Sequence, residues 1–142
     1  MVDISTFRRD AAAMAHGEWV SPGPKYGDFQ IKARALGYEY MDTQAAALRA
    51  AARKYGDEQR IPSEVRAAIN VDCMIRTALL DVRGLSEAGE PMSFDRFCEL
   101  LRDPGYGELA NVAFIVCGMV GRQRAAALEE AAGNFAEPLS AS

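Results

Sequence analysis

The segment from residue 63 to residue 83 is the stretch that most constrains the fold. On a helix at 100° per residue, its polar side chains fall on one narrow strip and nearly all other positions are apolar. A helix that is apolar over most of its circumference lies at the centre of a domain rather than at its edge. The segment therefore predicts a mainly α fold with residues 63–83 as its central helix.

Two charged residues interrupt the apolar arc of this predicted helix. Asp72 and Arg76 are four positions apart, so that their side chains are neighbours on the helix surface. They form either an intrahelical ion pair at the edge of the core or a pair that contacts a partner, since buried charges are retained chiefly when paired. In both interpretations Asp72 is the polar residue whose loss should be felt most.

The rest of the chain predicts further helices and a pair of strands. Phe29, Ile31 and Ala33 alternate with polar residues, which is typical of a half-buried strand. A second short extended run precedes it, and a two-stranded hairpin needs helices to pack on. The expected fold class is a small, mainly α helical domain of four to five helices with a short N-terminal β-hairpin. The expected helices cover about 3–16, 42–55, 63–83, 94–101 and 105–132, and the expected strands 18–20 and 28–34.

The length and composition suit one ordinary globular domain. The chain has 142 residues, 49% of them apolar and 25% charged, and we expect a single domain over 1–142 with flexible ends at 1–16 and 133–142. Cys73, Cys98 and Cys117 each have apolar neighbours and are expected to be buried reduced thiols.

Charge and hydropathy limit the partners. The net charge of −4 argues against a nucleic-acid partner, and acidic residues 57 and 58 interrupt the only basic cluster, at 49–60, which indicates a solvated helix face. The longest apolar run, 109–121, is too short to span a bilayer, and the first residues lack a secretory apolar region. We therefore expect no membrane partner and a location in the cytoplasm, with a bacterial host plausible.

No catalytic constellation stands out. The only histidine is His16, the cysteines lie far apart in sequence, and there is no CxxC, HExxH or phosphate-binding glycine pattern. We expect a protein that is not an enzyme and that carries no metal or other cofactor. The sole tryptophan, Trp19, is either an interface anchor or a core residue beneath the hairpin.

The last predicted helix carries two apolar faces, so that it is either sandwiched in the core or offers one face to a partner. Phe114 lies on one face, with Gly118 and Gly121. The opposite face is the larger, and from helical geometry we expect it to bind a partner, with Asp72 and Arg76 near its rim. Its predicted partner-binding residues are Val112, Val116, Met119 and Val120.

The middle of the chain resembles the small tail assembly chaperones of long-tailed bacteriophages. The resemblance lies in "LLDVRGLSEAGEPMSFDRFCELLRDPGYGEL": an aliphatic–acidic step and a glycine, an acidic loop with Gly-x-Pro, and an aromatic that opens a helix ending at Asp-Pro. The upstream "GEW…GDFQIKAR" is similar to the N-terminal extended segment of that family. Val82 stands where the family pattern has tryptophan.

The resemblance implies a cytoplasmic assembly protein of phage or prophage origin that is not part of the virion. Such chaperones bind the long helical tape measure protein, keep it soluble and help to recruit tail tube subunits. A spare apolar helix face fits this role, because it could cover an amphipathic helix of the tape measure, and it is also compatible with a homo-oligomer. The alternatives are a structural virion component, such as a head–tail connector or capsid-associated protein, and a small regulatory protein-binding module of antitoxin type.

Overall fold

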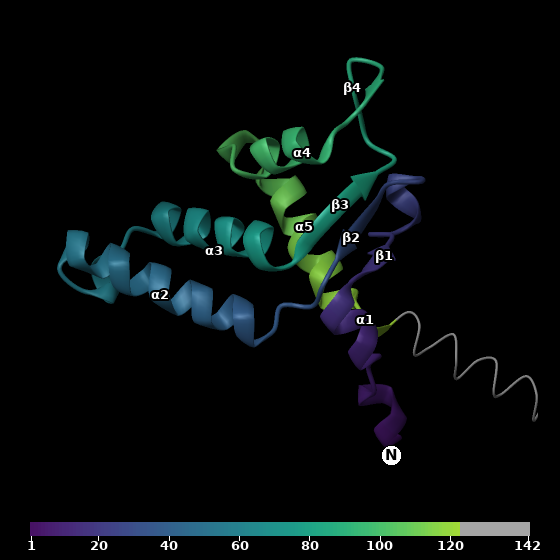
Figure 1. The fold of residues 1–142 in the computed structure, drawn as a ribbon, viewed down its shortest axis with the longest axis horizontal. Coiled ribbons are helices and arrows are strands. Elements are labelled where there is room, and N and C mark those ends of the chain that lie inside the picture. The colour runs from purple at the N-terminus through teal and green to yellow at the C-terminus, as the bar shows by residue number, and fades with distance from the viewer. Residues whose placement is uncertain (123–142) are drawn as a thin grey trace, which may run out of the picture.

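A computed structural model describes residues 1–122 of the chain (Figure 1). The fold is mainly α, as predicted, with a small antiparallel sheet. The helices are α1 Ala11–His16, α2 Tyr38–Tyr55, α3 Ser63–Thr77, α4 Phe94–Leu101 and α5 Gly107–Met119, with short 3-10 turns η1 Ile4–Phe7, η2 Pro24–Tyr26, η3 Glu58–Arg60 and η4 Pro104–Tyr106. The strands are β1 Glu18–Val20, β2 Gln30–Ala33, β3 Leu79–Arg83, β4 Ser86–Glu87 and β5 Glu90–Pro91.

The predicted N-terminal hairpin forms two strands of a three-stranded sheet. β2 lies in the centre, antiparallel to β1 on one side and to β3 on the other. The predicted alternation in β2 is confirmed, because Phe29, Ile31 and Ala33 are all buried while the side chains between them are partly exposed. Ile31 lies opposite Val82 of β3, and both side chains are buried.

The third strand corrects the prediction of one helix over residues 63–83. α3 ends at Thr77, and the next five residues form β3. The Arg34 backbone N–H donates to the Ala78 carbonyl at 2.8 Å. From there β3 forms its backbone hydrogen bonds with β2, and the side chains of Leu79 and Val82 are buried in the core. A partner strand almost fifty residues upstream thus overrides the local helical pattern.

Gly84 ends β3 at a point of close backbone approach. Its φ is +78°, and a Cβ atom there would lie 2.3 Å from the carbonyl oxygen of Asp28. No other residue fits without a backbone shift, because the conformation is left-handed and the space is filled. Beyond it, β4 and β5 form a hairpin that projects from the body at the top of Figure 1.

The core lies between the sheet, α4 and α5. Its largest fully buried side chains are Phe29, Phe97, Ile31, Met74, Val20, Val116 and Val120. The prediction of a central helix at 63–83 holds only for the second half of α3, because the buried residues of α3 all lie between Val71 and Thr77. α5, whose buried residues run from Ala110 to Cys117, is the more deeply embedded helix.

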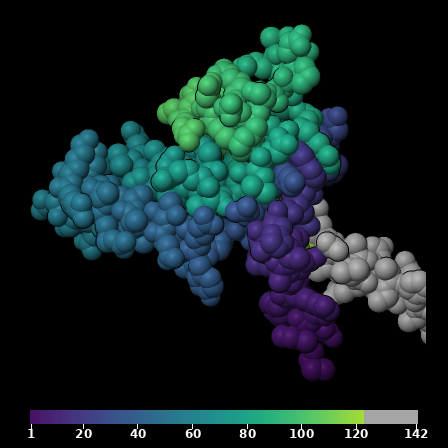
Figure 2. All heavy atoms as spheres, in the orientation of Figure 1, coloured from purple at the N-terminus to yellow at the C-terminus, as the bar shows by residue number. Residues whose placement is uncertain are grey.

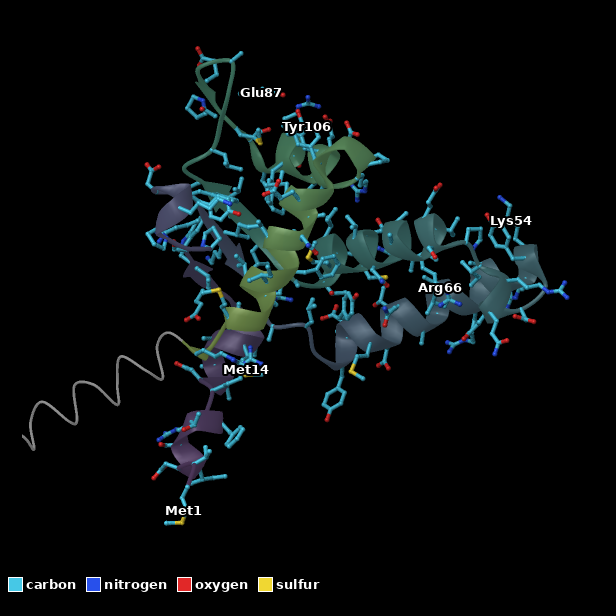
Figure 3. All side chains as sticks on the ribbon, turned by 180° about the vertical axis from the view of Figure 1, so that it is seen from behind. Met1, Met14, Lys54, Arg66, Glu87 and Tyr106 are labelled. Carbon is cyan, nitrogen blue, oxygen red and sulfur yellow. The ribbon has the colours of Figure 1, made fainter. Side chains whose placement is uncertain are left out.

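α2 and the first half of α3 form an arm that extends away from the sheet (Figure 1). No residue of α2 is fully buried, and the Gln44 side-chain amide donates to the Asn70 side-chain carbonyl at 2.6 Å between the two helices. In Figure 3, Lys54 lies near the far end of the arm and Arg66 lies part-way along it. Gly56 follows the last residue of α2 with a φ of +100°, the left-handed conformation that favours glycine after a helix.

The predicted helix over 3–16 is divided into η1 and α1. Extended backbone at Arg8 separates the two, and η1 projects from the body as the purple extension in Figure 2. α1 is fastened to the end of α5, because the Asp10 N–H donates to the Gly121 carbonyl at 2.9 Å. The predicted flexible end at 1–16 therefore includes a docked helix.

The last helix ends earlier than predicted within the described part of the chain. Val120 is extended, with a ψ of 133°, and Gly121 follows with a φ of +84°. The rest of the predicted helix, 123–132, and the predicted tail, 133–142, lie outside the described residues. Over residues 1–122, no helix is long and apolar enough to cross a membrane.

Candidate partner-binding groove

A groove of about 860 Å³ lies between α3 and the corner where α4 turns into α5. In Figure 1, α4 and the start of α5 lie above α3, to the left of β3. We call it the α3–α5 groove. Most of its lining is apolar or small, and the lining residues are Glu64, Ala67, Ala68, Asn70, Val71, Asp72, Leu101, Arg102, Asp103, Pro104, Gly107, Ala110, Asn111 and Phe114.

Two helices line the groove with rows of matching periodicity. The α3 row has residues 64, 67, 68 and 71, and the α5 row has residues 107, 110, 111 and 114. Both follow the i, i+3, i+4, i+7 spacing of one helix face, so that each helix presents a continuous strip to the groove. Small residues occupy the middle of the α3 row, at 67 and 68, and the start of the α5 row, at 107 and 110, which lets another chain approach the helix backbones closely.

Phe114 is the one large ring in the lining. It is partly buried and packs against the core, and it lies on the α5 face opposite the one predicted to bind a partner. Its neighbour Ile115 is 58% exposed, which is unusual for an aliphatic residue of a core helix. The exposed apolar surface of α5 is therefore on the Phe114 side.

The predicted partner-binding face of α5 is core instead. Val112 is 7% exposed, Val116 and Val120 are fully buried, and Met119 is partly buried against the same cluster. The sheet and α4 cover this larger apolar face, whereas the smaller face with Phe114 lines the groove.

The Asp72–Arg76 pair is confirmed as an intrahelical ion pair, and it has a third member. One carboxylate oxygen of Asp72 accepts from Arg76 at 2.9 Å and the other accepts from Arg102 at 3.2 Å. Arg102 follows α4, so that the network joins α3 to the α4 end of the groove. These side chains are 40–55% exposed, and pairs of this kind contribute about 1 kcal/mol or less each.

Trp19 does not take part in the groove. It lies half-buried on the face of the sheet that points away from Val20, where the Arg83 guanidinium stacks 4.1 Å above the ring centre. The groove residues that sequence reasoning missed are Ala67, Ala68, Arg102, Pro104 and Phe114. The second apolar face of the last helix was the one signal that could have found them.

The three cysteines of the chain lie in the interior of the described fold. Within residues 1–122, no cluster of three or more His, Cys, Asp or Glu side chains could hold a metal ion. Cys73, Cys98 and Cys117 are buried free thiols, and burial raises the pKa of each, to about 12 for Cys117. A protonated thiol is a poor nucleophile, so that these cysteines act as core residues.

Comparison with known proteins identifies no relative: the chain matches no family model, no curated protein and no solved structure. The geometry of the groove and the character of its lining are therefore the basis for a functional proposal.

Proposed function

We propose that this protein is a tail assembly chaperone of a long-tailed phage or prophage, and that it holds a helix of the tape measure protein in the α3–α5 groove. The observation that carries the proposal is the pair of small-residue rows on α3 and α5, which leaves an open apolar groove between them. Tail tube subunits would be recruited around the bound tape measure.

The shape of the groove favours a helix as its occupant. Each wall is one face of a helix, and a third helix packs against two others by placing its ridges in their grooves. Amphipathic helices bind such sites through apolar anchors at i, i+3, i+4 and i+7. A tape measure protein offers long helices of this kind, and a chaperone that covers their apolar faces would keep them soluble.

The segment that resembles the chaperone family also contributes to the groove. Leu101, Arg102, Asp103 and Pro104 belong to the helix end and Asp-Pro step of that resemblance, and all four line the groove. The Asp103 carboxylate caps η4 by accepting from the Gly105 N–H at 2.8 Å, which shapes the corner between α4 and α5. The family pattern and the groove thus share the same residues.

A co-expression experiment tests the proposal with a matched pair of variants. Ala67 lines the groove and Ala46 lies on α2 outside it, and both are exposed alanines within helices. Ala67→Tyr fills the groove and should greatly reduce the amount of co-expressed tape measure protein that stays soluble, whereas Ala46→Tyr should leave it at the wild-type level. Equal solubility with both variants would contradict the proposed site.

Mass spectrometry of purified particles separates the chaperone from a structural virion component. A chaperone should be missing from mature particles or present only in traces. Stoichiometric copies of the chain in the particle would overturn the chaperone proposal in favour of the virion role.

A further inference from the structure

We infer that the α3–α5 groove selects a basic amphipathic helix, with bulky aliphatic residues on its apolar face and Lys or Arg beside them. This inference rests on the proposed function and adds to it the chemistry of the bound segment. It is carried by the charges that line the groove and by the size of its wall residues.

The lining of the groove is acidic. Glu64, Asp72 and Asp103 contribute three carboxylates, against the single guanidinium of Arg102, so that the lining carries a net charge of −2. A partner with basic residues along the rim would meet charges of the opposite sign, whereas acidic residues there would be repelled.

The pairing of these groups leaves two of the carboxylates available. Asp72 is paired with both Arg76 and Arg102, so that this network carries a net charge of +1 and, together with Glu64 and Asp103, the groove and its ion-pair partner Arg76 carry −1. Neither Glu64 nor Asp103 has an ion-pair partner among residues 1–122. Arg66, the cation nearest to Glu64 along α3, donates instead to the backbone carbonyl of Glu58.

Helix ends do not cancel this charge. Glu64 lies in the first turn of α3. Asp103 precedes η4, the turn that leads into α5, and Glu108 lies in the first turn of α5 itself. A helix N-terminus carries only about half a positive charge, and each of these ends already has a full carboxylate beside it. The field at the groove therefore stays negative.

The walls determine the size of the side chains that fit. Ala67 and Ala68 form the middle of the α3 row, Gly107 and Ala110 begin the α5 row, and a Cβ added at Gly107 would meet nothing within 4 Å. The bound helix must itself supply the volume that fills the groove, because empty space between apolar walls loses packing contacts. Leu, Ile or Met side chains at i, i+3, i+4 and i+7 meet this requirement.

A pair of synthetic helical peptides tests the inference on the full chain. Both peptides carry the same leucine seam, one flanked by lysines and the other by glutamates, and binding is followed by fluorescence anisotropy at low and high salt. At low salt the lysine peptide should bind about 10-fold more tightly than the glutamate peptide, because two attractive exposed charge pairs replace two repulsive ones. At high salt the difference in affinity should shrink, because salt screens exposed charges.

Charge-removing variants localise the effect. Glu64→Gln/Asp103→Asn keeps the helix and the η4 cap, because Asn caps as well as Asp, and it should abolish most of the preference for lysine. Glu39→Gln/Glu90→Gln removes two exposed carboxylates that do not line the groove and should leave the preference unchanged.

The outcomes separate this inference from the proposed function. If both peptides bound equally and Ala67→Tyr abolished the binding of both, the charge selection would be overturned, and the groove would remain a site for a helix. Binding of neither peptide would overturn both. If the chain self-associated and Ala67→Tyr abolished that association, the groove would be assigned to a second copy of the chain. This result would also overturn the inference.

Discussion

The carboxylate of Asp72 on α3 accepts a hydrogen bond from the guanidinium of Arg102 at the end of α4, with an oxygen–nitrogen distance of 3.2 Å. The same carboxylate binds Arg76 one helical turn further along α3. The contact between Asp72 and Arg102 is the ion pair that links the two sides of the α3–α5 groove, so that it positions the groove walls as well as stabilising the fold.

Asp72→Asn should lower the free energy of unfolding only slightly, although Asp72 is at the centre of an ion-pair network. The pairs are 40–55% exposed, and the coupling between Asp72 and Arg102 should be about 0.5 kcal/mol. A double-mutant cycle with Asp72→Asn and Arg102→Gln, followed by urea unfolding, measures this coupling free energy. A coupling above about 2 kcal/mol would mean that the pair is far less solvated than its exposure indicates.

Gly84→Ala should be much more destabilising than Gly89→Ala. Both glycines have positive φ, +78° and +83°, but a Cβ at Gly84 would lie 2.3 Å from the Asp28 carbonyl oxygen, whereas Gly89 has nothing within 4 Å. The expected losses in free energy of unfolding are about 1 kcal/mol at Gly89, for the left-handed conformation alone, and more than about 3 kcal/mol at Gly84. Equal losses in urea unfolding would contradict the close approach of β3 to Asp28.

Val116 and Ile115 distinguish the two faces of α5. Val116 is fully buried, and Val116→Ala should lower the free energy of unfolding by about 2 kcal/mol. Ile115 is 58% exposed, and Ile115→Ala should change the free energy of unfolding by less than about 0.5 kcal/mol. If the two effects were reversed in thermal or urea unfolding, the face that carries Val116 would be the exposed one.

The Cys117 thiol should make stability depend on pH in the alkaline range. Burial raises its pKa from an ordinary value of 9.0 to about 12. The unfolded chain therefore loses the thiol proton first, so that this contribution to stability is complete below pH 9 and is lost as the pH rises toward 12. The slope is at most about 1.4 kcal/mol per pH unit for one group.

Cys117→Ala isolates this effect. The variant is expected to be less stable at pH 8, because a small cavity replaces the sulfur, yet its free energy of unfolding should fall less steeply than that of the wild type between pH 9 and pH 11. Urea unfolding at stepped pH measures both slopes. Parallel slopes would show that the thiol ionises equally in the folded and unfolded chains.

Local patterns in the sequence predicted several elements well. Phe29, Ile31 and Ala33 identified a half-buried strand, and the expected helix over 94–101 coincides with α4, at whose start the Ser93 hydroxyl accepts from the Arg96 N–H. Such features depend on neighbours a few residues away, so that they can be read from spacing and residue type alone.

The features that were missed depend on distant parts of the chain. Leu79–Arg83 continues the helical pattern of α3 and becomes a strand only because β2 lies beside it. Both faces of α5 are apolar in sequence, and only the placement of the sheet and α4 determines that Val116 is covered and Phe114 lines a groove. The groove is likewise a product of tertiary packing, since its two rows are about forty residues apart.

Site-specific photocrosslinking tests most directly whether the α3–α5 groove holds the tape measure protein. A benzoylphenylalanine is placed at Ala68, which lines the groove, or at Ala46, which does not, and the chain is co-expressed with the tape measure protein. The expected result is a covalent product from position 68, identified by mass as the tape measure adduct, and none from position 46. A tape measure adduct from position 46 alone, or no adduct from position 68 while the two proteins still co-purify, would contradict the proposed site.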